Sequence, residues 1–179
     1  MTSVSGDVEL SLAELRAVAR YVAETAQAVL PVFEDTHPGD PRPRAALDAA
    51  WEFVNGAPRS RRQRVTSMDA HRAAAAAATE PARLAAQAAG DAASAAYLHP
   101  IARAHQVGHL LRAAANAARI AEIAAGGDPE AADRALAEAR RRATPTLVAV
   151  LRRYPPAPRG RSRPAQLMSA LDRSLRDLG

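Results

Sequence analysis

Three of the five histidines lie within eleven residues, in the stretch HPIARAHQVGH that runs from His99 to His109. His105 and His109 have the i,i+4 spacing that places two side chains on the same face of a helix. Imidazole rings in such a pair can bind a metal ion, or one of them can act as a general acid and base. A polar stripe on an otherwise apolar helix has the same spacing, so both interpretations stay open.

The polar stripe continues along the helix that we expect between residues 101 and 125. Arg112, Asn116 and Arg119 follow the two histidines at steps of three, four and three residues. As one wall of a pocket, Arg112 and Asn116 hold an anionic or carbonyl group of a ligand, while His109 or His105 serves as the acid or base. As the solvated side of the helix, the stripe has no chemical role.

Asp91 is the carboxylate that we expect to complete such a pocket. It lies in the preceding predicted helix, and an antiparallel pairing of the two helices brings it to the level of His109 or Arg112. There it orients a histidine or pairs with an arginine in a site, or it forms a structural salt bridge. Gly90 and Gly108 stand beside Asp91 and His109. Because glycine costs about 1 kcal/mol in a helix interior, both predict a close helix contact at this level.

Four more residues are candidate contacts for a ligand. Asp69 and His71 are two residues apart in a predicted helix, hence on different faces, so at most one of them joins the site. Trp51 stands on an apolar stripe, where core packing is its expected role and ligand stacking is the alternative. Tyr97, near the end of the helix that carries Asp91, completes the set.

We expect no metal and no cofactor. The chain has no cysteine, which excludes disulfides and thiolate ligands. The segment HQVGH lacks the glutamate that a metalloprotease helix places after its first histidine. A Gly-x-Ser-x-Gly elbow and a glycine-rich phosphate loop are also missing from the sequence.

The elements that must position these residues are helices. Alanine supplies 47 of the 179 residues and is the best helix former, whereas β-branched and aromatic residues are scarce. Ser11 with Glu14 and Ser60 with Gln63 form capping boxes, and a Thr-Pro pair at 144–145 either kinks or divides the sixth helix. The pattern predicts an all-α bundle of about seven helices, over residues 11–33, 41–56, 60–78, 80–98, 101–125, 129–154 and 164–178.

The chain is expected to form a single domain with short capped loops. Residues 1–10 are an N-terminal tail, residues 11–154 the helical bundle, residues 155–163 a Pro- and Arg-rich linker, and residues 164–179 a C-terminal amphipathic helix packed on the bundle. The arginine groups at 59–64, 140–142 and 159–163 are expected to be solvated faces and loop charges, because they are far apart along the chain.

Charge and composition restrict the partners. The net charge of +5 permits an acidic partner, but 19 carboxylates are interspersed and aromatic residues make up 3% of the chain, so nucleic-acid binding is not expected. The N-terminus does not read as a signal peptide, and no apolar run is long enough to span a bilayer, so we expect a soluble, cytoplasmic protein. A homodimer is an open alternative, since alanine-rich helix faces are often completed by a partner.

A known family is indicated by three segments: DPRPRAALDAAWEF, MDAHRAA and AAQAAGDAASAAYLHPIARAHQVGHLLRAAANAARIAE. Over residues 8–178 the chain resembles the alanine-rich actinobacterial immunity proteins of the immunity-five-like type, some of which carry an exonuclease label. The resemblance implies an all-helical fold and neutralisation of a toxin by binding, and it implies no catalytic residues. Nuclease activity is not expected, because the sequence lacks the clustered carboxylates that hold two metal ions.

Two functions from different classes follow. The favoured one is a non-catalytic binding protein of immunity or self-resistance type that recognises a protein toxin or a small toxic metabolite. The alternative is a small-molecule enzyme of secondary metabolism, with His109 or His105 as the acid and base and Asp91 as the orienting carboxylate, in a pocket between the fourth and fifth helices. The enzyme requires His109, Arg112 and Asp91 to converge in a concavity, whereas a binding surface leaves them spread over the exterior.

Overall fold

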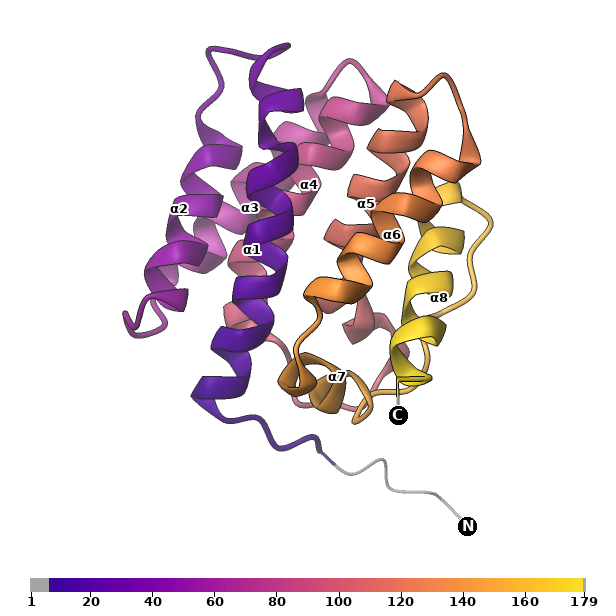
Figure 1. The fold of residues 1–179 in the computed structure, drawn as a ribbon. Coiled ribbons are helices and arrows are strands. Elements are labelled where there is room, and N and C mark those ends of the chain that lie inside the picture. Colours follow the sequence, from indigo (N-terminus) through magenta and orange to yellow (C-terminus); the bar gives the residue numbers. More distant parts are fainter. Residues whose placement is uncertain (1–6, 179) are drawn as a thin grey trace.

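The computed structural model describes residues 7–178. In this range the chain folds into eight α-helices without a β-strand, which confirms the all-α class (Figure 1). The helices are α1 (Leu12–Glu34), α2 (Arg42–Val54), α3 (Arg61–Ala76), α4 (Glu80–Ser94), α5 (Val107–Ala124), α6 (Pro129–Arg142), α7 (Pro145–Leu151) and α8 (Arg163–Arg176). Two 3₁₀ turns, Ala95–Tyr97 and Ala104–Gln106, lie between α4 and α5.

Helices α1 and α3 begin at the predicted capping boxes. The Oγ of Ser11 accepts a hydrogen bond from the backbone N–H of Glu14 at 3.2 Å, and the Glu14 carboxylate accepts the N–H of Ser11 at 2.8 Å. The same reciprocal arrangement joins Ser60 to Gln63 at the start of α3. Such caps satisfy backbone donors that have no partner inside the helix.

Two predicted helices differ from the structure. Thr144 caps a new helix, so the segment 129–154 divides into α6 and α7 and brings the number of helices to eight among the described residues. The helix expected from residue 101 begins only at Val107. The residues directly before it form the 3₁₀ turn Ala104–Gln106, and the segment before that turn is bound by distant residues: the backbone N–H of Val8 donates to Pro100 O, and the Tyr154 hydroxyl donates to His99 O at 2.9 Å. These contacts come from distant parts of the chain, so local patterns did not reveal them.

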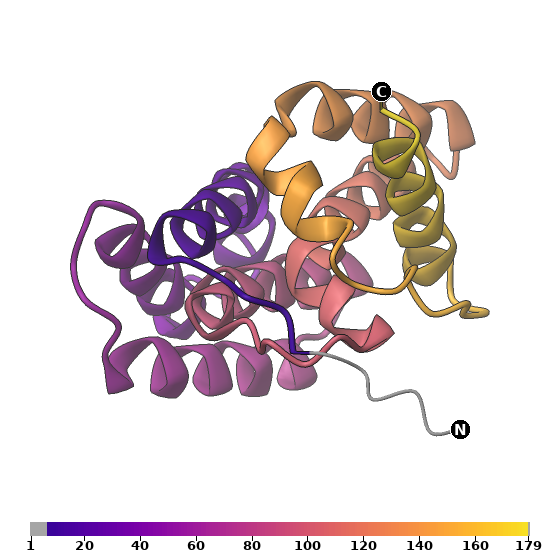
Figure 2. The same ribbon diagram turned by 90° about the horizontal axis from the view of Figure 1, so that it is seen from below.

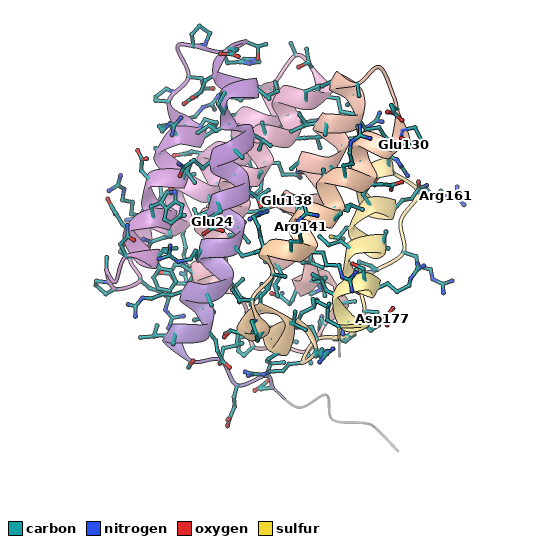
Figure 3. The ribbon with its side chains drawn as sticks, viewed as in Figure 1. Glu24, Glu130, Glu138, Arg141, Arg161 and Asp177 are labelled. Atoms are coloured by element: carbon teal, nitrogen blue, oxygen red, sulfur yellow. The ribbon has the colours of Figure 1, made fainter. Side chains whose placement is uncertain are left out.

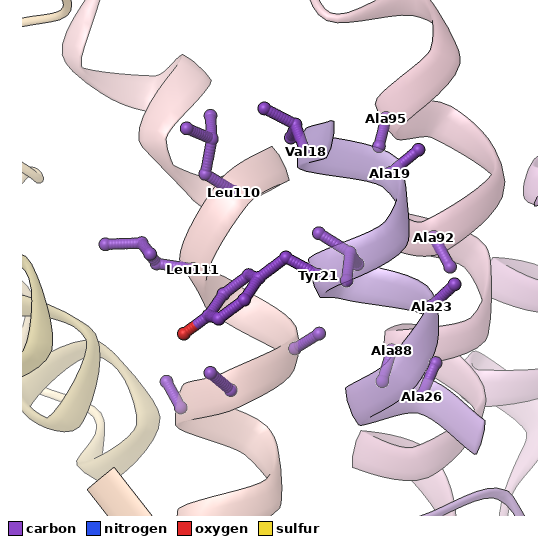
Figure 4. Packing of buried hydrophobic residues seen from close by; sticks show 14 of the residues in the cluster. Val18, Ala19, Tyr21, Ala23, Ala26, Ala88, Ala92, Ala95, Leu110 and Leu111 are labelled. Carbon is purple, nitrogen blue, oxygen red and sulfur yellow. The ribbon is translucent and has the colours of Figure 1, made fainter. Parts of the chain in front are cut away.

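Alanine faces bring the central helices close together. Figure 4 shows alanines of α1 opposite alanines of α4 and of the 3₁₀ turn that follows it, and all of them are fully buried: Ala19, Ala23, Ala26, Ala88, Ala92 and Ala95. Methyl groups this small let helix axes approach to the near end of the usual range of 8 to 10 Å. Larger side chains fill the space toward α5, where Tyr21 lies near Leu111 and its hydroxyl donates to Ala139 O of α6 at 3.0 Å.

Helix α4 has neighbours on most sides. It packs against α1, α2, α3 and α5, while α8 covers α5 on the other side of the molecule (Figure 2). Charged side chains lie on the outer faces, such as Glu138 and Arg141 of α6, which form an ion pair (Figure 3). None of the described helices combines the length and apolar character needed to cross a membrane. Because α4 packs against four other helices, a polar residue in its middle has to find its partners inside the protein.

Candidate functional site

Asp91 of α4 is the buried centre of the candidate site. Its side chain is 1% exposed, at the level where α3, α4 and α5 meet. Arg112 of α5, one of its two expected partners, binds it through both oxygens: Nε donates to Oδ2 at 2.8 Å and Nη2 to Oδ1 at 2.5 Å. This two-point geometry is the strongest form of a carboxylate–arginine hydrogen bond. Each Asp91 oxygen thereby accepts one hydrogen bond from Arg112.

His71 of α3 packs its ring against the backbone of α4 at Gly90. A Cβ atom at Gly90 would lie 2.8 Å from His71 Nε2 and 2.9 Å from Cδ2, so only glycine leaves room for the ring. The Ser67 hydroxyl donates to Gly90 O at 2.8 Å and His71 Nε2 lies 3.5 Å from Asp91 Oδ1. Gly90 thus makes the close helix contact that was predicted. The same prediction for Gly108 is wrong, because a Cβ there would meet no atom within 4 Å.

His109 joins the edge of this cluster through a serine. Its Nδ1 lies 3.2 Å from the Ser94 hydroxyl, which also donates to Asp91 O at 3.1 Å. A serine hydroxyl has one proton to donate. When that proton goes to the Asp91 carbonyl, His109 Nδ1 carries its own proton and donates to serine, and Nε2 is left as the free acceptor.

His105 does not share a helix face with His109, because it lies in the 3₁₀ turn before α5. It is exposed, and its Nε2 is 2.8 Å from the side-chain nitrogen of Gln106. The i,i+4 pair therefore does not form the helical wall that its spacing predicts.

Both clustered histidines are neutral at pH 7. Burial lowers the pKa of His71 and of His109, and the nearby Arg112 charge lowers both further, while the Asp91 carboxylate acts in the opposite direction. The cluster at neutral pH is thus one ion pair, Asp91 with Arg112, flanked by two uncharged imidazoles. The pair joins α4 to α5, and His71 of α3 lies against the same carboxylate, with Nε2 3.5 Å from Asp91 Oδ1.

A groove of about 400 Å³ lies beside the cluster, between α4, α5 and the start of α8. Arg112 and Asn116 are on its wall, but the residues that line it include neither His105 nor His109. Asn116 is fully buried, and its Nδ2 donates to Gln87 Oε1 at 2.8 Å and to Leu84 O at 3.2 Å. Its Oδ1 has no hydrogen-bond partner among the described residues.

The acidic residues around the groove are bound by arginines. Arg163 donates from Nη2 to the buried Glu122 at 2.6 Å, and Arg119 binds Glu122 at 2.7 Å and Glu80 at 3.0 Å. Hydrogen bonds from Arg163 and then Arg119 lower the pKa of Glu122 to about 2. Arg163 was expected to be a loop charge and is instead the anchor of α8. Sequence patterns did not single out Glu122, although its i,i+3 spacing from Arg119 on an apolar helix is a usable signal.

Three predicted ligand contacts lie outside the cluster. Asp69 pairs with Arg72 at 2.9 Å on the outer side of α3. Trp51 is partly buried against the core, and the Tyr97 hydroxyl donates to Ser60 O at 2.9 Å. Of the pair on α3, only His71 reaches Asp91.

No group of three or more potential ligands among residues 7–178 is arranged to hold a metal ion. Glu34 and His37 have the Glu-x-x-His spacing that metal-binding helices use, but they lie at the end of α1, where Glu34 binds Arg44 at 2.8 Å and His37 stacks on Phe33. These two side chains are therefore engaged in structural contacts.

Comparison with known proteins identifies the family. Neither the curated proteins nor the solved structures gave a significant match to the chain. The family described as "Imm-5 like putative immunity protein" matches residues 9–146, which covers α1 to α6 and the whole Asp91 cluster. The matched segment is far more than half of the chain, and the chain therefore belongs to this immunity protein family.

Proposed function

We propose that the protein is a non-catalytic immunity protein that neutralises a protein toxin by binding it. The family membership supports an immunity-type role. The state of Asp91 carries the choice of binding over catalysis: it is 1% exposed and both of its oxygens are held by Arg112. The Asp91 carboxylate that was expected to orient His109 is paired with Arg112, and His109 Nδ1 lies 3.2 Å from the Ser94 hydroxyl instead.

A protection assay tests the proposal. Each polypeptide encoded beside the gene of this chain is expressed in a bacterial host with and without the full-length chain, and one that stops growth serves as the toxin. We expect survival only with the chain, and a stoichiometric complex in size-exclusion chromatography. Binding requires at least one copy of the chain for each toxin, whereas an enzyme protects at a small fraction of that ratio. Protection at sub-stoichiometric amounts that His109→Ala abolishes contradicts the proposal and favours the enzyme.

A second candidate is the sequestration of a small toxic metabolite. It is supported by the groove between α4, α5 and α8, which places Arg112 and Asn116 on one wall. Native mass spectrometry of the chain purified from its own source tests this idea. A retained small molecule that is lost in Gln87→Ala, a variant of the same wall, supports sequestration. A chain that carries no small molecule in the wild type contradicts it.

A further inference from the structure

The outer face of α3 combines exposed apolar and basic side chains. Val65 and Met68 are 42% and 55% exposed, and with Leu12 they are the large apolar side chains most open to solvent in the described part of the chain. Their spacing of three residues puts them side by side on the helix surface. We call the surface formed by Arg61, Arg64, Val65 and Met68 the α3 face.

Helix α3 lies at the edge of the bundle, away from α6 and α8 (Figure 2). Its inner side packs against α2 and α4 through small and polar residues such as Ser67 and Ala70. The opposite side has a shallow hollow of about 400 Å³, lined by residues of α3 alone: Arg61, Arg64, Val65, Met68, Asp69 and Arg72. The apolar pair therefore lies within a ring of charged side chains.

The charge of this ring is positive. Arg72 is neutralised by Asp69 at 2.9 Å, but Arg61 and Arg64 have no carboxylate partner among the described residues. The Arg64 guanidinium lies 4.3 Å from the centre of the Tyr97 ring, and Arg59 lies over the same ring at 5.6 Å. Stacking on an aromatic ring limits the motion of an arginine and leaves its N–H groups available for carboxylates.

We propose that the α3 face is where the chain docks a protein toxin, through an acidic patch on the toxin that surrounds a nonpolar side chain. Carboxylates of the toxin pair with Arg61 and Arg64, and the nonpolar side chain covers Val65 and Met68. Methionine and arginine are enriched at protein interfaces, and apolar anchors inside a charged rim are typical of their energetic centres. This inference rests on the proposed immunity function.

Charge and chemistry favour this occupant over two others. A second copy of the chain would place this face against an identical one, and the one carboxylate among the residues that line the hollow, Asp69, is already bound by Arg72, so the copy offers no free partner for Arg61 and Arg64. A nucleic acid has the phosphates that arginines bind, but its backbone does not cover Val65 and Met68. The nearby ring of Tyr97 is already covered by Arg59 and Arg64, so it is not free for base stacking.

The Asp91 cluster has a role in this interface that does not require chemistry. On the side of α3 that faces the core, the Ser67 hydroxyl donates to Gly90 O of α4, and the His71 ring packs on Gly90 with Nε2 3.5 Å from the Asp91 carboxylate. These contacts fix α3 before any partner arrives. A rigid helix loses little entropy on binding, which is how a small exposed face attains useful affinity.

The test uses full-length variants and the toxin against which the chain protects in the assay above. Titration calorimetry measures binding of wild type, Met68→Asp, Arg61→Glu and two controls. Met68→Leu keeps the apolar surface, and Arg161→Glu reverses an exposed charge in the loop before α8 (Figure 3). We expect Met68→Asp and Arg61→Glu each to raise Kd by about tenfold or more, and both controls to stay within about twofold of wild type. Thermal unfolding verifies that all variants are folded.

The outcomes separate the inference from the function. If the toxin forms a complex and all four variants bind it as wild type does, the α3 face is not the interface, while the immunity function stands. If no complex and no protection appear, both fail. A dimer of the free chain that Met68→Asp dissociates assigns the face to a second copy and overturns the inference. Binding to duplex DNA that Arg61→Glu abolishes, without toxin binding, overturns it in favour of nucleic acid.

Discussion

Replacement of Arg112 by alanine is the perturbation that most directly tests the Asp91 cluster. Asp91 is 1% exposed and both of its oxygens are bound by Arg112. The other basic side chain beside it is His71, whose Nε2 is 3.5 Å from Oδ1 and whose ring is uncharged at pH 7. Removal of one partner of a buried pair typically costs about 3 to 5 kcal/mol, because the remaining charge has no compensation. The Arg112 side chain is 37% exposed, so water can reach part of the gap, and we expect about 3 kcal/mol.

Such a loss is large for a domain whose total stability is about 5 to 15 kcal/mol. For a chain of this length it lowers Tm by about 6 to 12 °C, at about 2 to 4 °C for each kcal/mol. Thermal unfolding and urea titration at pH 7.5 measure the change. The effect is expected to shrink as the pH falls toward 6, because loss of the Arg112 charge raises the pKa of His71 and the protonated ring then neutralises Asp91.

The decisive comparison is a cycle with Asp91→Ala. Arg112 is partly exposed, so its charge remains hydrated when Asp91 is removed, and Asp91→Ala is expected to cost about 1 kcal/mol. The double variant contains no unpaired buried charge. Addition of Asp91→Ala to Arg112→Ala is therefore expected to recover about 1 to 2 kcal/mol, so a second substitution stabilises the protein. Strictly additive losses would refute the argument that the two residues stabilise the fold as a closed pair.

Two further predictions concern packing and pH. Ala at Gly90 gains about 1 kcal/mol of helix propensity but meets the His71 ring, and overpacking costs about 1 to 3 kcal/mol, so Gly90→Ala is expected to lower the free energy of unfolding. Gly108→Ala meets no atom within 4 Å and is expected to raise it; thermal unfolding of the pair measures both, and equal stabilisation would contradict the ring contact. The free energy of unfolding is also expected to decrease as the pH is lowered, in two stages. The first stage begins below pH 6.5, and the second runs from pH 4.5 down to about pH 2. In the first stage the unfolded chain binds protons at the positions of His71 and His109, whose folded pKa values are lowered, and in the second the Arg163–Glu122 pair is lost by protonation. Urea titrations between pH 8 and pH 3 measure this, and a constant value from pH 7.5 to pH 5.5 would disprove the histidine assignment.

Helix starts were predictable from the sequence because a cap needs only residues that are adjacent along the chain. Ser11 with Glu14 and Ser60 with Gln63 make the expected hydrogen bonds. The start of α5 depends instead on distant contacts, from Val8 and Tyr154 to the segment after α4. For this reason the helical spacing of His105 and His109 was misleading, since one of the two lies outside the helix.

Some contacts of the candidate site could likewise be predicted from the order of the helices, and others could not. An antiparallel arrangement of α4 and α5 follows from their order, and it placed Arg112 within reach of Asp91. The position of His71 beside Asp91 could not be predicted from local sequence patterns, because it requires α3 to cross α4 at Gly90. The Arg163–Glu122 pair joins residues 41 positions apart, with α6, α7 and a loop rich in proline and arginine between them. A sequence without an alignment offers no signal that couples such residues.

The small size of alanine connects the fold to its mode of recognition. Alanine faces let α1 and α4 approach closely, and at this separation little space is left between them for an internal ligand (Figure 4). The one carboxylate in the middle of α4 is then used to bind α5 and α3, as the occupied oxygens of Asp91 show. Side chains that can contact a partner lie on the outer helices. The outer face of α3 carries apolar side chains among arginines that have no carboxylate partner in the described part of the chain. A tightly packed core of this composition therefore favours a protein that binds through its surface, with the buried polar cluster serving to hold that surface rigid.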